Sequence, residues 1–128
     1  MKYLLDTHVF LWWITDSPLI SDKVSKLITE GSSDLYWSSA SSWEISIKYV
    51  NGKLPLPDKP EIFLLAELAK NRISSLTITD EHAFLAGHLP PYHRDPFDRM
   101  LVAQSNFENM TLISSDQLIT QYQVNIFW

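Results

Sequence analysis

Short apolar runs alternate with longer segments of mixed polarity along the whole chain, and this alternation predicts an α/β fold. Apolar runs bounded by turn residues are typical of buried parallel strands, whereas apolar positions three and four residues apart are typical of helices with one buried face. Strands are expected at 2–5, 35–37, 73–78, 111–114 and 124–127. Helices are expected at 7–14, 22–30, 61–71, 80–88, 96–109 and 116–122. Strands that alternate with helices indicate βαβ units around a central parallel sheet.

The segment 43–50 fits two patterns. Trp43, Ile45 and Ile47 alternate as in a strand, while Ala40, Trp43 and Ile47 recur at helical spacing. The pattern of apolar positions therefore leaves the structure of this segment open.

Turn and cap residues divide the other elements. Ser21 and Thr79 are expected to cap the helices that follow them. The serine-rich stretch 38–42 is expected to form a turn, and 53–60, which contains three prolines, is expected to be an extended loop.

The composition fits a single packed domain over residues 1–128. Hydrophobic residues make up 45% of the chain and aromatic residues 12%, which argues against disorder. The formal net charge of −5 argues against a protein that coats nucleic acid with a basic face. It does not argue against a nuclease, because bound metal ions can supply positive charge where phosphates lie. The absence of cysteine excludes disulfides and thiol chemistry.

The first residues resemble a signal peptide only superficially. Asp6 and His8 interrupt the apolar run, and no cleavage site of small residues follows. No uninterrupted apolar stretch approaches the length of about 20 residues that a membrane-spanning helix needs. A soluble cytoplasmic protein without membrane contact is therefore expected.

Four acidic residues lie where a strand gives way to a helix or in the first turns of a helix: Asp6, Glu44, Asp98 and Asp116. In an open α/β sheet, side chains at the carboxyl ends of parallel strands converge on one crevice. Carboxylates gathered there repel one another, and a hard divalent cation such as Mg²⁺ or Mn²⁺ offsets that repulsion. The pattern therefore predicts a metal-dependent phosphodiesterase.

Several short motifs lie in register along the chain: LLDTH at 4–8, WEI at 43–45 with Lys48 and then GKL at 52–54, DPFDRML at 95–101, and ISSD at 113–116. Together they resemble the PIN-domain ribonucleases, and most closely the VapC-like toxins of bacterial toxin-antitoxin pairs. The resemblance implies a three-layer fold with a central parallel sheet of four to five strands flanked by helices. It also implies one or two Mg²⁺ or Mn²⁺ ions, hydrolysis of single-stranded RNA, a homodimer and a cognate antitoxin. It favours a helix around Glu44.

The same resemblance assigns roles by position. Asp6, Glu44, Asp98 and Asp116 would be catalytic residues and metal ligands. The hydroxyls of Thr7 and Ser115 could orient a carboxylate or a water molecule, although such hydroxyls equally often serve as caps or turn residues.

Two cations lie close to these acids in the sequence. Lys48 and Arg99 could hold the RNA backbone, and the alternative for both is a solvated surface charge. In the acidic pocket an Arg or Lys of the antitoxin could displace the metal and silence the enzyme.

The other polar residues have structural interpretations. Asp6 and Asp116 could each cap the helix that follows. Asp95 precedes a proline and is expected to be an N-cap, which leaves Asp98 as the ligand of that motif, with Asp95 a supporting candidate only. The four histidines lack the spacing of metal ligands and are expected to be structural or surface residues.

Two other functions remain open. One is a catalytically inactive PIN-like module for protein interaction, which would keep the sheet without binding metal. The other is a Mg²⁺-dependent phosphohydrolase of the receiver or haloacid-dehalogenase type. Those enzymes generally carry a paired Asp motif after the first strand, which Asp6-Thr7-His8 lacks.

Overall fold

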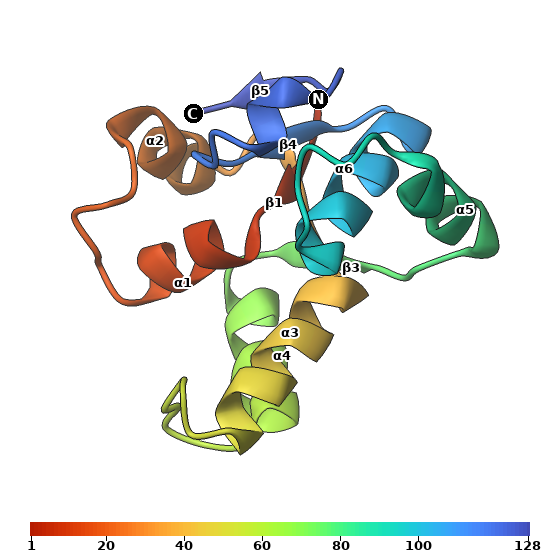
Figure 1. Ribbon diagram of the computed structural model, residues 1–128. Coiled ribbons are helices and arrows are strands. Elements are labelled where there is room, and N and C mark those ends of the chain that lie inside the picture. The colour runs from red at the N-terminus through yellow and green to blue at the C-terminus, as the bar shows by residue number, and fades with distance from the viewer.

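Five short parallel strands form one sheet at the centre of the computed structural model, which describes residues 1–128 (Figure 1). The strands are β1 (Lys2–Leu5), β2 (Asp34–Ser38), β3 (Ile73–Leu76), β4 (Thr111–Ile113) and β5 (Ile126–Phe127). Their spatial order is β3-β2-β1-β4-β5. The order reverses between β1 and β4, and the carboxyl ends of strands at such a switch point usually border a binding crevice.

Six α-helices and one 3₁₀ helix connect the strands. They are α1 (Thr7–Ile14), α2 (Asp22–Glu30), α3 (Ser39–Val50), α4 (Pro60–Lys70), α5 (Asp80–His88), α6 (Pro96–Phe107) and η1 (Ile119–Gln121). In Figure 1, α3 and α4 lie side by side and project beyond the sheet. None of the helices combines the length and the apolar character needed to cross a membrane.

The alternation of side chains along the strands creates a core on each face of the sheet. Leu5 packs with Phe10 of α1 and Trp37 of β2 in one cluster, to which α2 and α4 also contribute. Leu4, on the opposite face, packs with Leu101 of α6 in a second cluster. Successive residues of a strand point to opposite faces, so the apolar side chains of β1 must be covered on both faces of the sheet. Helices provide this cover on each face. The predicted three-layer α/β fold with a parallel sheet is confirmed.

Helix caps explain where several helices begin. The side chain of Ser21 accepts a hydrogen bond from the backbone of Val24, and Thr79 forms a reciprocal capping box with His82, so both predicted caps are confirmed. Ser38 caps α3 by accepting from the Ala40 backbone N–H. The turn expected at 38–42 is therefore wrong, because these residues end β2 and form the first turn of α3.

The structure also decides the ambiguous segment and moves the ends of several predicted elements. Residues 43–50 are helical, as the family resemblance favoured. The helix expected at 116–122 is reduced to the 3₁₀ helix η1, and the strand expected at 73–78 ends at Leu76. The helix expected to reach residue 109 ends at Phe107, and Asn109 follows with a positive φ of 55°.

The guanidinium of Arg99 holds the segment between α5 and α6 against the body of the protein. It donates hydrogen bonds of 2.9 Å to the carbonyl oxygens of Ala86, Leu89 and Pro90. It also lies 3.3 Å from the hydroxyl of Tyr122. These bonds tie the last turn of α5 and the loop that follows it to α6.

Replacing Arg99 should therefore destabilise the fold. We expect Arg99→Ala to lower the free energy of unfolding by on the order of 2–4 kcal/mol, because several carbonyls lose a charged donor at once. Arg99→Lys should restore only part of this, since an ammonium cannot reproduce the fork of donors. Urea denaturation measures both changes.

The exposed neighbour Arg94 provides the control. Arg94→Ala should change the free energy of unfolding by no more than about 0.5 kcal/mol. Equal effects of the Arg94 and Arg99 substitutions would contradict a structural role for the Arg99 guanidinium.

Candidate active site

The pairing of β1 with β4 builds the base of the site. Leu5 pairs in register with Ile113, so the residues that follow them, Asp6 and Ser114, lie side by side at the carboxyl ends of the two strands. The Asp6 backbone N–H donates to the Ile113 carbonyl at 3.0 Å. The Ser114 hydroxyl donates to Asp6 Oδ2 at 2.7 Å and accepts from the Asp116 N–H at 3.1 Å. Ser114 thereby links two of the four predicted acids.

The carboxylate of Asp6 is not used as a helix cap. Asp6 occupies the N-cap position of α1, but its side chain makes no capping hydrogen bond. The residue is only 5% exposed, and Oδ1 is buried without a hydrogen-bond partner. Burial raises the pKa of Asp6, and the hydrogen bond from Ser114 offsets this only in part. An unpaired buried carboxylate oxygen is costly unless a ligand completes its coordination.

The start of α6 divides two tasks between two aspartates. Asp95 Oδ1 accepts hydrogen bonds from the backbone N–H groups of Phe97 at 2.8 Å and Asp98 at 3.4 Å, so the expected N-cap is confirmed. Asp98, one turn later, keeps its carboxylate for the pocket. Burial, followed by the negative charge of Asp6, raises the pKa of Asp98 to about 7. A carboxyl group perturbed in this way is typical of a functional site.

His93 belongs to the same site, which the sequence did not predict. Its Nε2 lies 2.9 Å from Asp98 Oδ2 and 2.9 Å from Asp116 Oδ2. Its Nδ1 accepts a hydrogen bond from the Asp95 backbone N–H at 3.1 Å, which places the proton of the neutral ring on Nε2. Burial lowers the pKa of His93, but the hydrogen bond to Asp116 and the charge of Asp98 outweigh it, so the pKa is raised. His93 is therefore not a surface residue, and it links the predicted acids Asp98 and Asp116.

Asp116 serves both the local turn and the pocket. Its Oδ1 accepts from the Leu118 backbone N–H at 2.8 Å, while Oδ2 contacts His93. One ligand atom from each of His93, Asp98 and Asp116 lies within 4.8 Å of the others. Such a cluster could hold a metal ion.

Glu44 approaches from α3. It is 5% exposed, and its Oε2 accepts from Lys48 Nζ at 2.7 Å, one helical turn away. Its Oε1 is buried without a partner. Lys48 therefore offsets the charge of one oxygen and leaves the other available, while its own side chain remains 37% exposed.

The other residues that the sequence suggested for the site have different partners in the structure. The hydroxyl of Thr7 is buried and donates to Ser41 Oγ at 2.7 Å, so it connects α1 to α3. Ser114, and not its neighbour Ser115, holds the carboxylate of Asp6. Arg99 directs its guanidinium to the carbonyls described above and away from any of the four acids.

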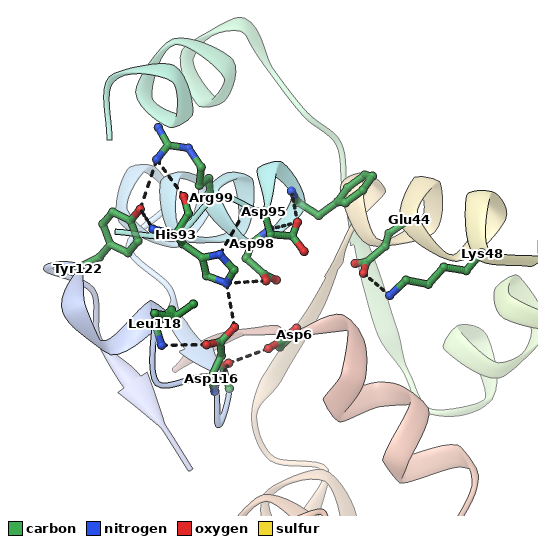
Figure 2. Close-up of polar contacts among 12 residues, drawn as sticks. Asp6, Glu44, Lys48, His93, Asp95, Asp98, Arg99, Asp116, Leu118 and Tyr122 are labelled. Atoms are coloured by element: carbon green, nitrogen blue, oxygen red, sulfur yellow. Dashed lines mark hydrogen bonds and ion pairs between the residues drawn. The ribbon is translucent and has the colours of Figure 1, made fainter. Parts of the chain in front are cut away.

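The four acids face one space from four different parts of the chain (Figure 2). Figure 2 shows Glu44 reaching from α3 and Asp98 from α6 toward the space that Asp6 and Asp116 also border. The donors are carboxylate oxygens with one imidazole nearby, a set that suits a hard divalent cation. The buried, unpartnered oxygens of Asp6 and Glu44 fit such an ion, because coordination would satisfy them.

Solved structures share this fold. A chain of VapBC2 from Rickettsia felis, crystallised with a DNA fragment from its promoter, is 17% identical with a TM-score of 0.74, over 99% of this chain and 98% of that chain. A chain of DNA-bound VapBC from Salmonella typhimurium is 17% identical with a TM-score of 0.68, over 99% and 97%. For FitAcB from Neisseria gonorrhoeae the identity is 18% and the TM-score 0.65, over 98% and 96%.

Sequence comparison gives the family. No curated protein sequence matches the chain. The model of the PIN domain family matches residues 3–124, which include all four acids, and the chain therefore belongs to the PIN domain family.

Proposed function

We propose that this protein is a metal-dependent endoribonuclease that hydrolyses phosphodiester bonds of single-stranded RNA, and that it is the toxin of a toxin-antitoxin pair. The observation that carries the proposal is the convergence of Asp6, Glu44, Asp98 and Asp116 at the switch point of the sheet, with a buried unpartnered oxygen on Asp6 and on Glu44. The choice of RNA rests on the resemblance to VapC-like toxins.

The ligands of one or two Mg²⁺ or Mn²⁺ ions would be Asp6, Asp98 and Asp116, with Glu44 completing the set. Oxygen donors suit these hard cations, and the chain has no cysteine to favour a softer metal. When bound, a divalent cation supplies positive charge to the phosphate oxygens and lowers the pKa of water. Hydrolysis then adds water across one P–O bond and releases two RNA fragments.

The surrounding residues hold the acids in place for this role. Ser114 fixes one oxygen of Asp6 and leaves Oδ1 without a hydrogen-bond partner. The Nε2–H of His93 can donate to Asp98 or Asp116, because Nδ1 is the nitrogen that accepts from the Asp95 backbone. Such contacts to the ligands are what orient a metal site.

The two aspartates at the start of α6 give the sharpest test of the proposal. Asp98→Asn should keep the fold and lower the rate of RNA cleavage by about 10³-fold or more, because an amide cannot replace the charge of the ligand. Asp95→Asn should keep most of the activity, since Asn is an equally good N-cap. Cleavage of a labelled single-stranded RNA in Mg²⁺ or Mn²⁺ measures both rates.

Chelation provides the matching control for the metal. Excess EDTA should abolish cleavage by the wild type, and added Mg²⁺ or Mn²⁺ should restore it. Undiminished cleavage in EDTA would contradict a metal-dependent mechanism. If Asp95→Asn were as inactive as Asp98→Asn, Asp95 would belong to the catalytic set as well.

The free energy of unfolding of the metal-free protein should depend on pH through the carboxyl group of Asp98. The pKa of Asp98 rises from 3.8 to about 7 on folding, so the folded state retains this proton where the unfolded state has lost it. Stability should therefore fall as pH rises between about 4 and about 7, and the raised pKa of Asp6 acts in the same direction. The raised pKa of His93 adds a loss of stability that begins above its ordinary value of 6.5. Urea unfolding in chelator at several pH values measures the slope.

The Asp98→Asn variant removes this contribution together with the part of the His93 pKa shift that the charge of Asp98 causes. Relative to the wild type, its metal-free stability should increase as the pH rises through the same window. If the free energy of unfolding changed with pH in the same way for both proteins, folding would not raise the pKa of Asp98.

We further propose a homodimer that binds a cognate antitoxin. Several structures of similar fold are VapBC or FitAB complexes, and the acidic pocket suits an Arg or Lys of a partner.

The product of the open reading frame next to this gene should co-purify with the protein and suppress RNA cleavage. Changing the partner's basic residues singly to Ala should identify one whose loss restores cleavage. A monomer that cleaves RNA unaffected by that product would contradict the assignment.

A further inference from the structure

Two aromatic side chains border the acidic pocket. Trp43 directly precedes Glu44 on α3, and Phe97 directly precedes Asp98 on α6. The two rings contact each other edge to face, with centroids 5.3 Å apart and planes inclined by 79°. Trp43 is 62% exposed, whereas Phe97 is half-buried.

The helical repeat explains why both rings lie beside the acids. Successive residues of an α-helix are about 100° apart around its axis. Where the carboxylates of Glu44 and Asp98 turn into the pocket, the preceding side chains lie at its edge. The first turns of α3 and α6 lie next to each other (Figure 1), so the two edges meet. The contact between Trp43 and Phe97 is therefore part of the same arrangement that brings the acids together.

Trp43 differs from the tryptophans that build the core. Trp37 is 1% exposed, and its indole N–H donates to Ser42 Oγ at 2.8 Å. Trp13 donates to Asn71 Oδ1 at 2.8 Å. Trp43 instead leaves most of its ring in water, and Phe97 covers it only through an edge-to-face contact. Trp43 therefore presents an aromatic ring to solvent at the border of the acidic pocket.

We propose that Trp43 and Phe97 form a platform on which the base of the nucleotide next to the cleaved phosphodiester stacks, with Trp43 as the ring that contacts the base. The inference rests on the proposed ribonuclease activity and deepens it, because it assigns a substrate subsite. Flat aromatic rings bind unpaired bases in this way, and the binding tolerates different bases because every base has a π face.

The charge of the chain favours stacking as a source of affinity. Binding through phosphate contacts needs many Lys or Arg side chains, but the protein carries a net charge of −5. Near the pocket, Lys48 is paired with Glu44, and the guanidinium of Arg99 is bonded to backbone carbonyls. A base that stacks on Trp43 would position the adjoining phosphate over the acids without further cations.

The first measurement compares three variants of the full chain on one single-stranded RNA. Trp43→Ala should lower kcat/KM by about 5- to 150-fold, which corresponds to the loss of one stacked base. Trp43→Phe should retain most of the wild-type value, because it keeps a ring. Val50→Ala, at a position 82% exposed on the same helix, should match the wild type. Thermal melts confirm that each variant is folded.

The second measurement uses two RNAs, each of which lacks the base of one nucleotide that flanks the cleaved bond. In one RNA the abasic nucleotide lies on the 5′ side, and in the other it lies on the 3′ side. For the wild type, removing the stacked base should lower kcat/KM by a factor similar to that of Trp43→Ala. On that abasic RNA, Trp43→Ala should cause no further loss, because the two changes remove the same interaction. In the inactive Asp98→Asn background, Trp43→Ala should also weaken equilibrium binding of the intact RNA by a similar factor.

The possible outcomes separate this inference from the proposed function. Absence of RNA cleavage by the wild type in Mg²⁺ or Mn²⁺ would overturn both. Wild-type cleavage that Trp43→Ala leaves unchanged, or lowers equally on intact and abasic RNA, would overturn only the platform. A change from dimer to monomer in Trp43→Ala, measured by light scattering, with RNA binding intact would assign Trp43 to a protein interface instead.

Discussion

The parallel pairing of β1 with β4 is the interaction on which the candidate site depends. The two strands are distant in sequence, and their register places Asp6 beside Ser114. The strand order reverses at this pair, so a crevice is expected beyond their carboxyl ends, and Figure 2 shows Glu44 of α3 and Asp98 of α6 reaching toward it. A shift of one residue in this register would turn the side chain of Asp6 to the opposite face of the sheet and separate it from Ser114.

Gathering carboxylates at this edge costs electrostatic free energy, and neighbouring side chains offset the cost locally. Lys48 pairs with one oxygen of Glu44, Nε2 of His93 lies between Asp98 and Asp116, and the hydroxyl of Ser114 bonds Asp6. The offset is incomplete, because burial and, after it, the charge of Asp6 still raise the pKa of Asp98 to about 7. The fold therefore holds the acids in an arrangement that a divalent cation would stabilise further.

The sequence predicted the α/β class, the parallel sheet and most helix starts, because those features follow from apolar spacing and capping residues near in sequence. It did not distinguish Ser114 from Ser115, since that choice depends on the register of β4 against β1. It also missed His93, which lies in an irregular segment and meets Asp98 and Asp116 only through the tertiary fold. The role of Arg99 was hidden for the same reason, because its partners are backbone carbonyls.

The start of α6 shows how the protein separates structural from chemical tasks among similar residues. Asp95 satisfies the free N–H groups of the helix, and Arg99 secures the preceding loop. Asp98 lies between them, so its backbone is fixed from both sides, and its carboxylate contacts His93 and not the helix backbone. Pre-organisation of this kind lets a charged group remain in an unfavourable environment, because the fold and not the carboxylate itself supplies the stability. By the same logic Ser38 caps α3, and Glu44 on that helix remains available to the pocket.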